Sequence, residues 1–349
     1  SHVSFFDEAD TANAAVAELK KKNVETIIVL LHEGGSTSTA GNGAGSVAGI
    51  NACVAPSGPV VDVVDRMDNE IDVVVTGHTN WAINCVLDGK IVTGAASFGR
   101  LVTDIDLTVS RASKDVVGAT VNNVIVTRTV DKAEDLTALV AKYAELAAPT
   151  ENRVIGTASE ALTRSSTAPP AGNGESVPGD IIADAQLWAT SQPGFPAVPA
   201  VVSFMNPGGI RADINAGTIT YGEAFSVQPF GNILVTMTMT GQQIDAVLEQ
   251  QTSGTTLQIP ASLTYDRSAS AAAGSRISNI RINGIAVDPL ASYRVTVNNF
   301  LADGGDGFTV LRQGTDRYFG EIDLDAFARY LEAHDPIAPT PRNRITLVP

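Results

Sequence analysis

Apolar and polar positions near the start of the chain follow a pattern that predicts two consecutive strand-helix units. Residues 7–23, "DEADTANAAVAELKKKN", have helical spacing with lysines in the last turn, where cations suit the helix dipole. The runs "ETIIVLL" (25–31) and "VVV" (73–75) predict buried strands, and "PVVDVVDRMDN" (59–69) predicts a helix between them. Such units are typical of an α/β layer whose functional residues lie beyond the carboxyl ends of the strands.

The pattern changes after residue 80. Residues 85–98, "CVLDGKIVTGAASF", predict a hairpin around Asp-Gly, and residues 101–110, "LVTDIDLTVS", alternate as a strand does. Apolar residues recur at helical spacing from 131 to 148, and Pro149 follows. We therefore expect a connecting helix that ends before Pro149 and a domain boundary near residue 150.

The second part of the chain has its own strands and helices. We expect strands at "AVVSFMN" (200–206) and "YRVTVNNFL" (293–301) and a helix at "GQQIDAVLEQQ" (241–251). Two segments of small residues, 33–49 and 167–179, are loops by composition.

Composition narrows the class of protein. A chain of 349 residues that is 44% hydrophobic can form two cores. Its net charge of -15 argues against a nucleic acid polymer or an anionic membrane as the main partner. The apolar runs are far shorter than the ~20 residues of a membrane span, so we expect no span. Counting alone leaves open whether Cys53 and Cys85 form a disulfide or are two buried thiols.

Polar side chains follow the two predicted strands of the first part. His32 comes after one strand, and the other runs into "GHTN" with His78 and Asn80. Neutral imidazole suits transition metals such as Zn, Mn or Fe, and an amide oxygen is an acceptable ligand. The alternative is that each histidine is a hydrogen bonder at a strand end. Two His and one Asn make an incomplete metal site.

Three turn segments of the second part carry candidate binding residues. In "FMNPGGIRADI" (204–214), adjacent glycines let backbone amides approach an anion and Arg211 offers a fork of donors, although an ordinary turn remains the alternative. In "NNFLADGGDGFTVL" (298–311), aromatic rings and Asp306 could bind a flat ligand with hydroxyls. The alternative is a hairpin with Phe300 and Phe308 in the core, and "QPFGN" (228–232) allows the same two interpretations.

Taken together, the order of these segments resembles the 5′-nucleotidase family of two-domain metallophosphoesterases. The segment "GESVPGDIIADAQ" (174–186) is similar to the one that opens the family's C-terminal domain. The resemblance implies an α/β protein with part of a calcineurin-like metallophosphoesterase domain, a mixed α/β sandwich, at residues 1–128. A linker helix at 129–150 would join it to an α+β substrate-binding domain at 151–349.

The resemblance also implies roles for single residues. Metal ligands would be His32, His78 and Asn80, and a disulfide would join Cys53 to Cys85. Arg211 would hold the substrate's phosphate with Arg164 as a second ligand, beside the Gly208 and Gly209 turn. Phe230 and Phe300 would sandwich the nucleobase, Asn206 and Asn232 would bond its edge, and Asp306 would bond the ribose hydroxyls.

Some family blocks are absent from this sequence. The Asp-x-His pair, the bridging Asp and the Gly-Asn-His block, which supply the other metal ligands and a catalytic His, do not occur. The chain therefore resembles the C-terminal part of a longer protein, with its catalytic residues upstream of residue 1. Two smaller departures are the lack of an Arg close before Glu175 and of a Gly in "LQIPASLTYD".

The resemblance predicts an exported bacterial hydrolase of nucleotide phosphoesters that uses two divalent ions, Zn, Mn or similar, about 3.5 to 4 Å apart. This chain alone would be catalytically incomplete. One alternative is a nucleotide-binding or surface-interaction module without catalysis. Another is a phosphoesterase for 2′,3′-cyclic nucleotides or sugar nucleotides.

Overall fold

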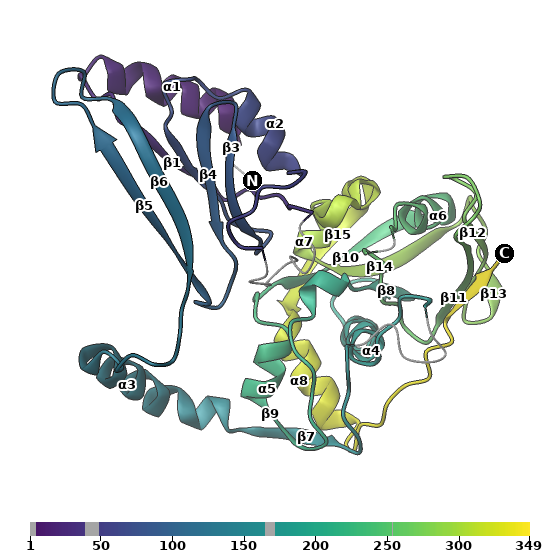
Figure 1. The fold of residues 1–349 in the computed structure, drawn as a ribbon. Coiled ribbons are helices and arrows are strands. Elements are labelled where there is room, and N and C mark those ends of the chain that lie inside the picture. Colours follow the sequence, from purple (N-terminus) through teal and green to yellow (C-terminus); the bar gives the residue numbers. More distant parts are fainter. Residues whose placement is uncertain (1–4, 39–48, 165–171, 253) are drawn as a thin grey trace. The chain divides into compact units, whose positions relative to one another are not determined.

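The computed structural model describes residues 5–38, 49–164, 172–252 and 254–349. Figure 1 shows the elements in chain order. The chain divides into two compact units, residues 1–133 and 134–349, which are described separately below. Parts of the loops predicted at 33–49 and 167–179 lie outside the described residues.

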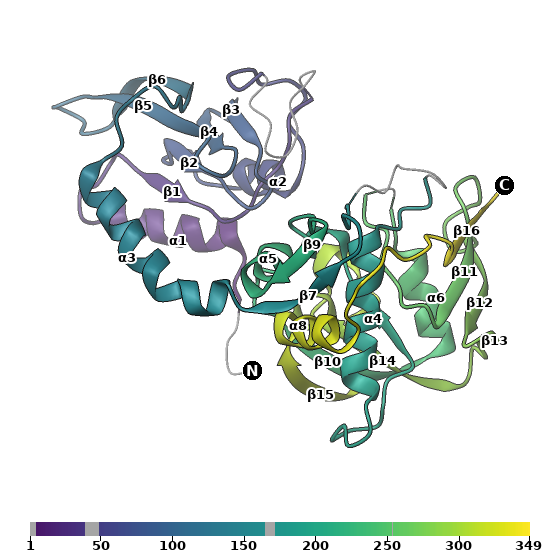
Figure 2. The same ribbon diagram turned by 90° about the horizontal axis from the view of Figure 1, so that it is seen from below.

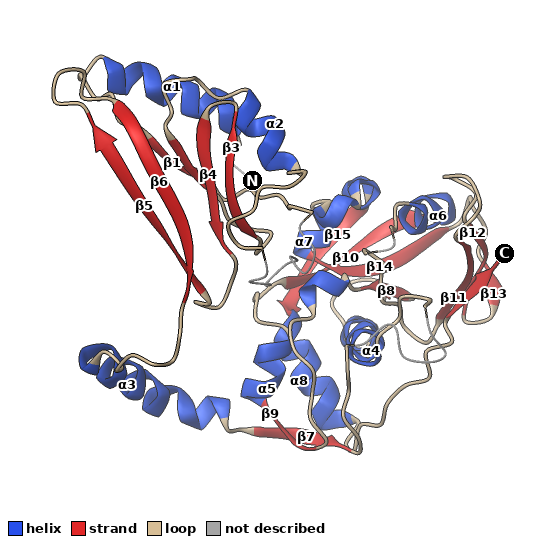
Figure 3. Ribbon diagram, in the orientation of Figure 1, coloured by secondary structure: helices blue, strands red, loops and turns tan. Residues whose placement is uncertain are grey.

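The first unit is built on a four-stranded sheet in the order β1-β2-β4-β3. The parallel pairs β1-β2 and β2-β4 confirm the α/β layer, and β3-β4 is the expected Asp-Gly hairpin. Figure 3 shows helices α1 and α2 next to this sheet. They pack on it through one apolar cluster that includes Val16, Val64 and Val74. The elements are α1 (Glu8–Lys20), β1 (Ile28–Leu30), α2 (Pro59–Asp65), β2 (Val73–Val75), β3 (Ala82–Leu87), β4 (Lys90–Ala95), β5 (Leu101–Val109) and β6 (Val116–Ile125).

Local signals explain where the first helix begins and ends. The Asp7 side chain accepts a hydrogen bond from the backbone N–H of Asp10, which caps α1, and Lys20 lies in its last turn. Strand β5 pairs with β6 in an antiparallel two-stranded sheet. The sequence predicted β5 but gave no indication of this partner.

Cys53 and Cys85 form a disulfide between the loop before α2 and strand β3. This pairing is the one the resemblance implies, and it settles the choice that counting left open. The two cysteines are 32 residues apart. In the chain-entropy model, closing a loop of this length stabilises the folded state by roughly 3 to 4 kcal/mol.

The second unit opens with α3 (Glu134–Glu151), which continues through Pro149. The expectation that the helix ends before this proline was therefore wrong. Proline removes one N–H donor from the last turn, but the N–H of Asn152 still bonds to the carbonyl of Ala148 at 2.9 Å.

Two four-stranded sheets, ordered β15-β10-β14-β8 and β13-β12-β11-β16, and the pair β7-β9 form the rest of this unit. Figure 2 shows α4 and α8 side by side next to these strands, and their residues share an apolar cluster that includes Ile182 and Phe327. The helices are α4 (Val177–Ser191), α5 (Tyr221–Val227), α6 (Gly241–Glu249), α7 (Asn299–Ala302) and α8 (Asp323–Ala333). The strands are β7 (Val154–Ala158), β8 (Val202–Phe204), β9 (Gly217–Thr220), β10 (Ile233–Thr240), β11 (Leu263–Ser268), β12 (Ile277–Ile282), β13 (Ile285–Ala286), β14 (Ser292–Asn298), β15 (Thr315–Ile322) and β16 (Ile345–Val348).

Strand β14 is shorter than the sequence predicts. It was expected to run to Leu301, but it ends at Asn298 and the next residues form α7. The reason is a helix cap, because the Asn298 side chain accepts a hydrogen bond from the N–H of Leu301. Since β14 and β8 are parallel neighbours, both strands end at the same edge of the sheet. No helix in the described residues is both long and apolar enough to cross a membrane.

Candidate functional site

The carboxyl ends of β8 and β14 bring together Asn206, Asp306 and Phe300, three predicted binding residues of the second unit. Asn206 follows β8 and is buried, and its Nδ2 donates to Oδ2 of the exposed Asp306 at 2.8 Å. Asp306 has φ of 52°, in the left-handed region, between Gly304 and Gly307, which also have positive φ. The turn thus holds a carboxylate outward in a conformation that few side chains adopt.

Phe300 lies on α7 against the same turn. Its side chain is 39% exposed, whereas Phe308 is fully buried in the core. The interpretation as two core phenylalanines is therefore right for Phe308 and wrong for Phe300. A Cβ at Gly305 would lie 2.4 Å from Cε1 of Phe300, so only glycine lets the ring rest on the turn.

Arg211 lies in the turn after β8, close to Phe230. Its Nη1 donates to the carbonyl of Gly208 at 3.0 Å, and its guanidinium carbon is 5.7 Å from the centre of the Phe230 ring. Phe230 is 58% exposed. A Cβ at Gly209 would lie 2.5 Å from Cε of Met205, so a larger residue there would displace the methionine side chain. The arrangement presents a cation next to an exposed aromatic face.

Arg164 is tied to the same segment of chain. Its Nε lies 3.4 Å from Oδ1 of Asp213, and its Nη1 donates to the carbonyl of Ile210 at 3.1 Å. Both arginines are exposed, so their remaining donors face solvent.

Asn232 begins the approach to β10 and contacts a buried acid. Its carbonyl accepts from the N–H of Asp323 at 2.8 Å. Burial raises the pKa of the Asp323 carboxyl to about 6, while hydrogen bonds from the Leu324 N–H and the Asn232 side chain lower it. The Asn232 side chain therefore bonds to a buried carboxyl whose pKa is raised.

A second set of buried acids surrounds Arg344 near the start of α4. Nη1 and Nη2 of Arg344 donate to the two carboxylate oxygens of Asp184 at 3.0 and 2.7 Å. The backbone N–H of Arg344 donates to the carboxylate of Glu175. Nε lies 3.8 Å from Oδ2 of Asp180, whose carboxylate oxygens have no hydrogen-bond partner in the described part of the chain. Burial raises the pKa of Asp180 to about 8, and Arg344 opposes this shift.

In the first unit, the two predicted metal-binding histidines lie together. The rings of His32 and His78 meet edge to face with centroids 5.4 Å apart, and both residues are exposed. His78 and Asn80 have positive φ in the loop after β2. Residues 5–38, 49–164, 172–252 and 254–349 contain no group of three His, Cys, Asp or Glu side chains that could hold a metal. The residues described here thus do not provide the ligands of a dinuclear centre.

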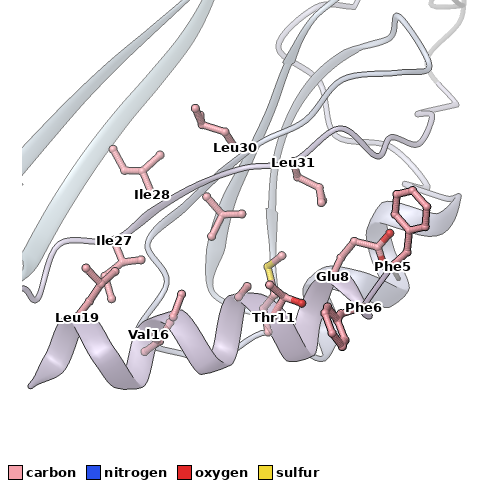
Figure 4. Close-up of a pocket in the computed structure, with 14 residues that line it drawn as sticks. Phe5, Phe6, Glu8, Thr11, Val16, Leu19, Ile27, Ile28, Leu30 and Leu31 are labelled. Carbon is pink, nitrogen blue, oxygen red and sulfur yellow. The ribbon is translucent and has the colours of Figure 1, made fainter. Parts of the chain in front are cut away.

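An apolar groove of about 490 Å³ runs between α1 and β1 of the first unit. Figure 4 shows Val16 and Leu19 of the helix facing Ile27, with Phe5 and Phe6 at the end of the groove near the start of α1. Leu30 of β1 is 82% exposed. In the described part of the chain, β1 forms one edge of its sheet, so the exposed Phe5, Phe6 and Leu30 lie beside a strand edge.

Comparisons with known proteins show what the chain is similar to. Residues 154–313 match the family model described as "5'-nucleotidase, C-terminal domain". The chain is 29% identical over 99% of its length to Endonuclease YhcR of Bacillus subtilis, and 28% identical over 94% to Cell wall protein Lmo0130 of Listeria monocytogenes. It spans 27% and 43% of the lengths of these two relatives.

A solved structure agrees over nearly the whole chain. The 5'-nucleotidase precursor from Thermus thermophilus matches 99% of this chain with a TM-score of 0.67 and 27% identity, and the match covers 68% of that protein. This confirms the predicted mixed α/β fold. All the predicted substrate-binding residues of the second unit lie within residues 154–313. Residues 154–313 therefore match the C-terminal domain of the 5′-nucleotidase family, and these findings confirm the resemblance to that family that the sequence shows.

Proposed function

We propose that the second unit binds a nucleotide and that the functional protein hydrolyses nucleotide phosphoesters outside the cytoplasm. The observation that carries the proposal is the turn that joins Asn206 to Asp306 and supports Phe300. This turn combines a hydrogen-bonding carboxylate with an exposed aromatic ring, which are the groups that recognise ribose hydroxyls and a base.

Phosphate recognition rests on Arg211. A guanidinium has five N–H donors, and the bond to Gly208 uses one of them, so a fork of donors remains for phosphate oxygens. The neighbouring Arg164 adds positive charge in a chain whose net charge is -15. Asp213 offsets part of the charge of Arg164, so Arg211 is the main anion ligand of this segment in the proposal.

Base recognition rests on the two half-exposed phenylalanines. Phe230 lies in the turn after α5 and Phe300 on α7 after β14, and both residues are partly exposed. We assign the Asn232 amide to the edge of the base. The Asn206 amide, to which the resemblance gives the same role, is buried and bonds to Asp306 and Asn298 instead. Stacking on aromatic rings tolerates any base, so the Asn232 amide would determine base preference.

Hydrolysis needs groups beyond those described. His32 and His78 can supply two ligands and Asn80 a third, which is too few for two ions, so we derive no metal-dependent step from these residues. We infer that a further polypeptide segment covers the apolar groove beside β1 in the intact first unit, because exposed apolar surface of this kind is usually covered. The disulfide and the relative named a cell wall protein support an extracytoplasmic location.

A binding and activity experiment tests the proposal. Calorimetry should show that AMP binds the chain more tightly than adenosine or inorganic phosphate does; failure to bind all three would contradict the nucleotide site. Phosphate release from AMP and 2′,3′-cyclic AMP, with Mn²⁺ or Zn²⁺, should then be compared between this chain and the full-length gene product. Activity only in the longer protein supports the hydrolase, whereas inactivity in both with AMP still bound favours a nucleotide-binding module.

Replacing Phe300 with alanine should weaken adenosine binding by about 1 to 3 kcal/mol, because a stacked base loses its partner. Binding of inorganic phosphate should stay unchanged, since Phe300 is not part of the arginine segment. The exposed Phe319 of β15 offers a control, because Phe319→Ala removes a ring of similar exposure outside the proposed site. Equal adenosine affinity in wild type and Phe300→Ala would remove Phe300 from the base site.

A further inference from the structure

Asn298 is a buried amide at the junction of the proposed nucleotide site. Its side chain is 1% exposed, at the end of β14. The Nδ2 group donates to Oδ1 of Asn206 at 3.1 Å, and Oδ1 accepts from the N–H of Leu301 at 2.9 Å. One amide therefore contacts the residue that holds Asp306 and caps the helix that carries Phe300.

We propose that Asn298 is a positioning residue that aligns the ribose and base contacts with each other. The proposal rests on the nucleotide site proposed above. Because Nδ2 of Asn298 donates to Oδ1 of Asn206, the Asn206 amide is held in one of its two orientations. In that orientation the Nδ2 of Asn206 is directed to Asp306. The cap on α7 fixes the first turn of the helix, and with it the position of Phe300.

The two functions of Asn298 depend on different atoms. Its oxygen holds the helix, and its nitrogen holds Asn206. Aspartate at this position keeps an oxygen for the cap, since Asp is as good an N-cap as Asn. It has no donor for Asn206, whose amide would turn over and place its own oxygen beside the carboxylate of Asp306. The Asn298→Asp variant thus separates the ribose contact from the base contact.

Calorimetry with adenosine and 2′,3′-dideoxyadenosine tests this inference on the full chain. The wild type should prefer adenosine, because only adenosine has hydroxyls for Asp306. In Asn298→Asp, adenosine should bind about tenfold more weakly, which is the loss of one well-made hydrogen bond. The affinity for 2′,3′-dideoxyadenosine should stay within about twofold, because α7 remains capped. An unchanged preference for adenosine in the variant would overturn the inference.

Two further variants separate positioning from general stability. Asn298→Ser keeps a short capping hydroxyl that cannot span to Asn206, so it should also lose the preference for adenosine, and it serves if Asn298→Asp does not fold. Gln251→Leu removes an equally buried amide that bonds to Leu248 and Leu257 near the end of α6. It should lower the melting temperature without changing the preference. If the wild type binds neither nucleoside, the proposed function fails instead.

Discussion

Replacing Arg344 with methionine is expected to lower the free energy of unfolding by about 3 to 5 kcal/mol at pH 7, as measured by urea denaturation. Methionine keeps much of the side-chain volume but removes the cation that bonds to both oxygens of Asp184. Glu175 and Asp180 stay buried beside the vacated position. The cost arises because buried carboxyl groups lose the positive charge that offsets their burial.

The loss of unfolding free energy in Arg344→Met should depend on pH in a defined direction. Asp180 has a folded pKa raised to about 8, so it stays protonated in the folded protein while the unfolded chain ionises above about pH 4. Its contribution to stability is therefore full at low pH and is lost as the pH rises toward 8. Burial also raises the pKa of Glu175, and Arg344 opposes both shifts. Removing Arg344 should thus destabilise the protein more at pH 8 than at pH 5.

Two matched variants make this result specific. Arg281→Met removes an exposed arginine from β12, whose bonds to Asn279 and Gly284 are on the surface, and should change stability by less than about 0.5 kcal/mol. Asp180→Asn in the wild type should flatten the fall of stability between pH 5 and 8, because the amide cannot ionise. An Arg344→Met variant as stable as Arg281→Met at both pH values would contradict the importance of the buried charge.

Replacing Arg211 with alanine should remove the phosphate contribution to binding. The affinity for AMP is expected to fall about 100-fold, because charge-assisted hydrogen bonds to a phosphate contribute on the order of 1.5 to 3 kcal/mol. The affinity for adenosine should change less than about threefold. Adenosine has no phosphate, so it loses only the contribution of the cation next to Phe230. Calorimetry with both ligands measures the two effects.

The exposed Arg281 again provides the control for Arg211. Arg281→Ala removes one positive charge from the same unit but should leave both affinities unchanged, which separates local contact from net charge. If Arg211→Ala binds AMP as well as the control does, the phosphate lies elsewhere in the chain. A fall in adenosine affinity as large as that in AMP affinity would instead show that the variant has disturbed the turn.

Local sequence pattern predicted the elements of the first unit except β6, but of the second unit only α3, β8, α6 and β14. Helix α1 and the β3-β4 hairpin follow from a capping Asp7 and an Asp-Gly turn, which act over a few residues. Pro149 misled the prediction because one missing donor in a last turn does not end a helix. The partnership of β5 with β6 could not be read from spacing, because it depends on contacts between segments that share no local signal.

The residues of the candidate site also fall into those that a local pattern predicts and those that only the folded structure brings together. Glycine and aromatic residues in short turns identified Asp306 and Phe300 from the sequence, and the structure adds that Gly305 lies beneath the ring. Asn298 was missed because it lies inside the strand predicted at 293–301, and its partner Asn206 is 92 residues away. The acids around Arg344 were inside a recognised segment, but nothing in their spacing shows that an arginine near the C-terminus lies among them.

The hydrogen bond between Asn206 and Asp306 joins positions 100 residues apart and depends on β14 lying beside β8. A chain segment containing only one of these strands has half of the proposed binding turn. The proposed nucleotide binding and the cooperative folding of the second unit are therefore thermodynamically linked, so a saturating ligand at 100 times its Kd should raise the free energy of unfolding by about 2.7 kcal/mol. Ligand occupancy thereby becomes a measure of how much of this unit is folded.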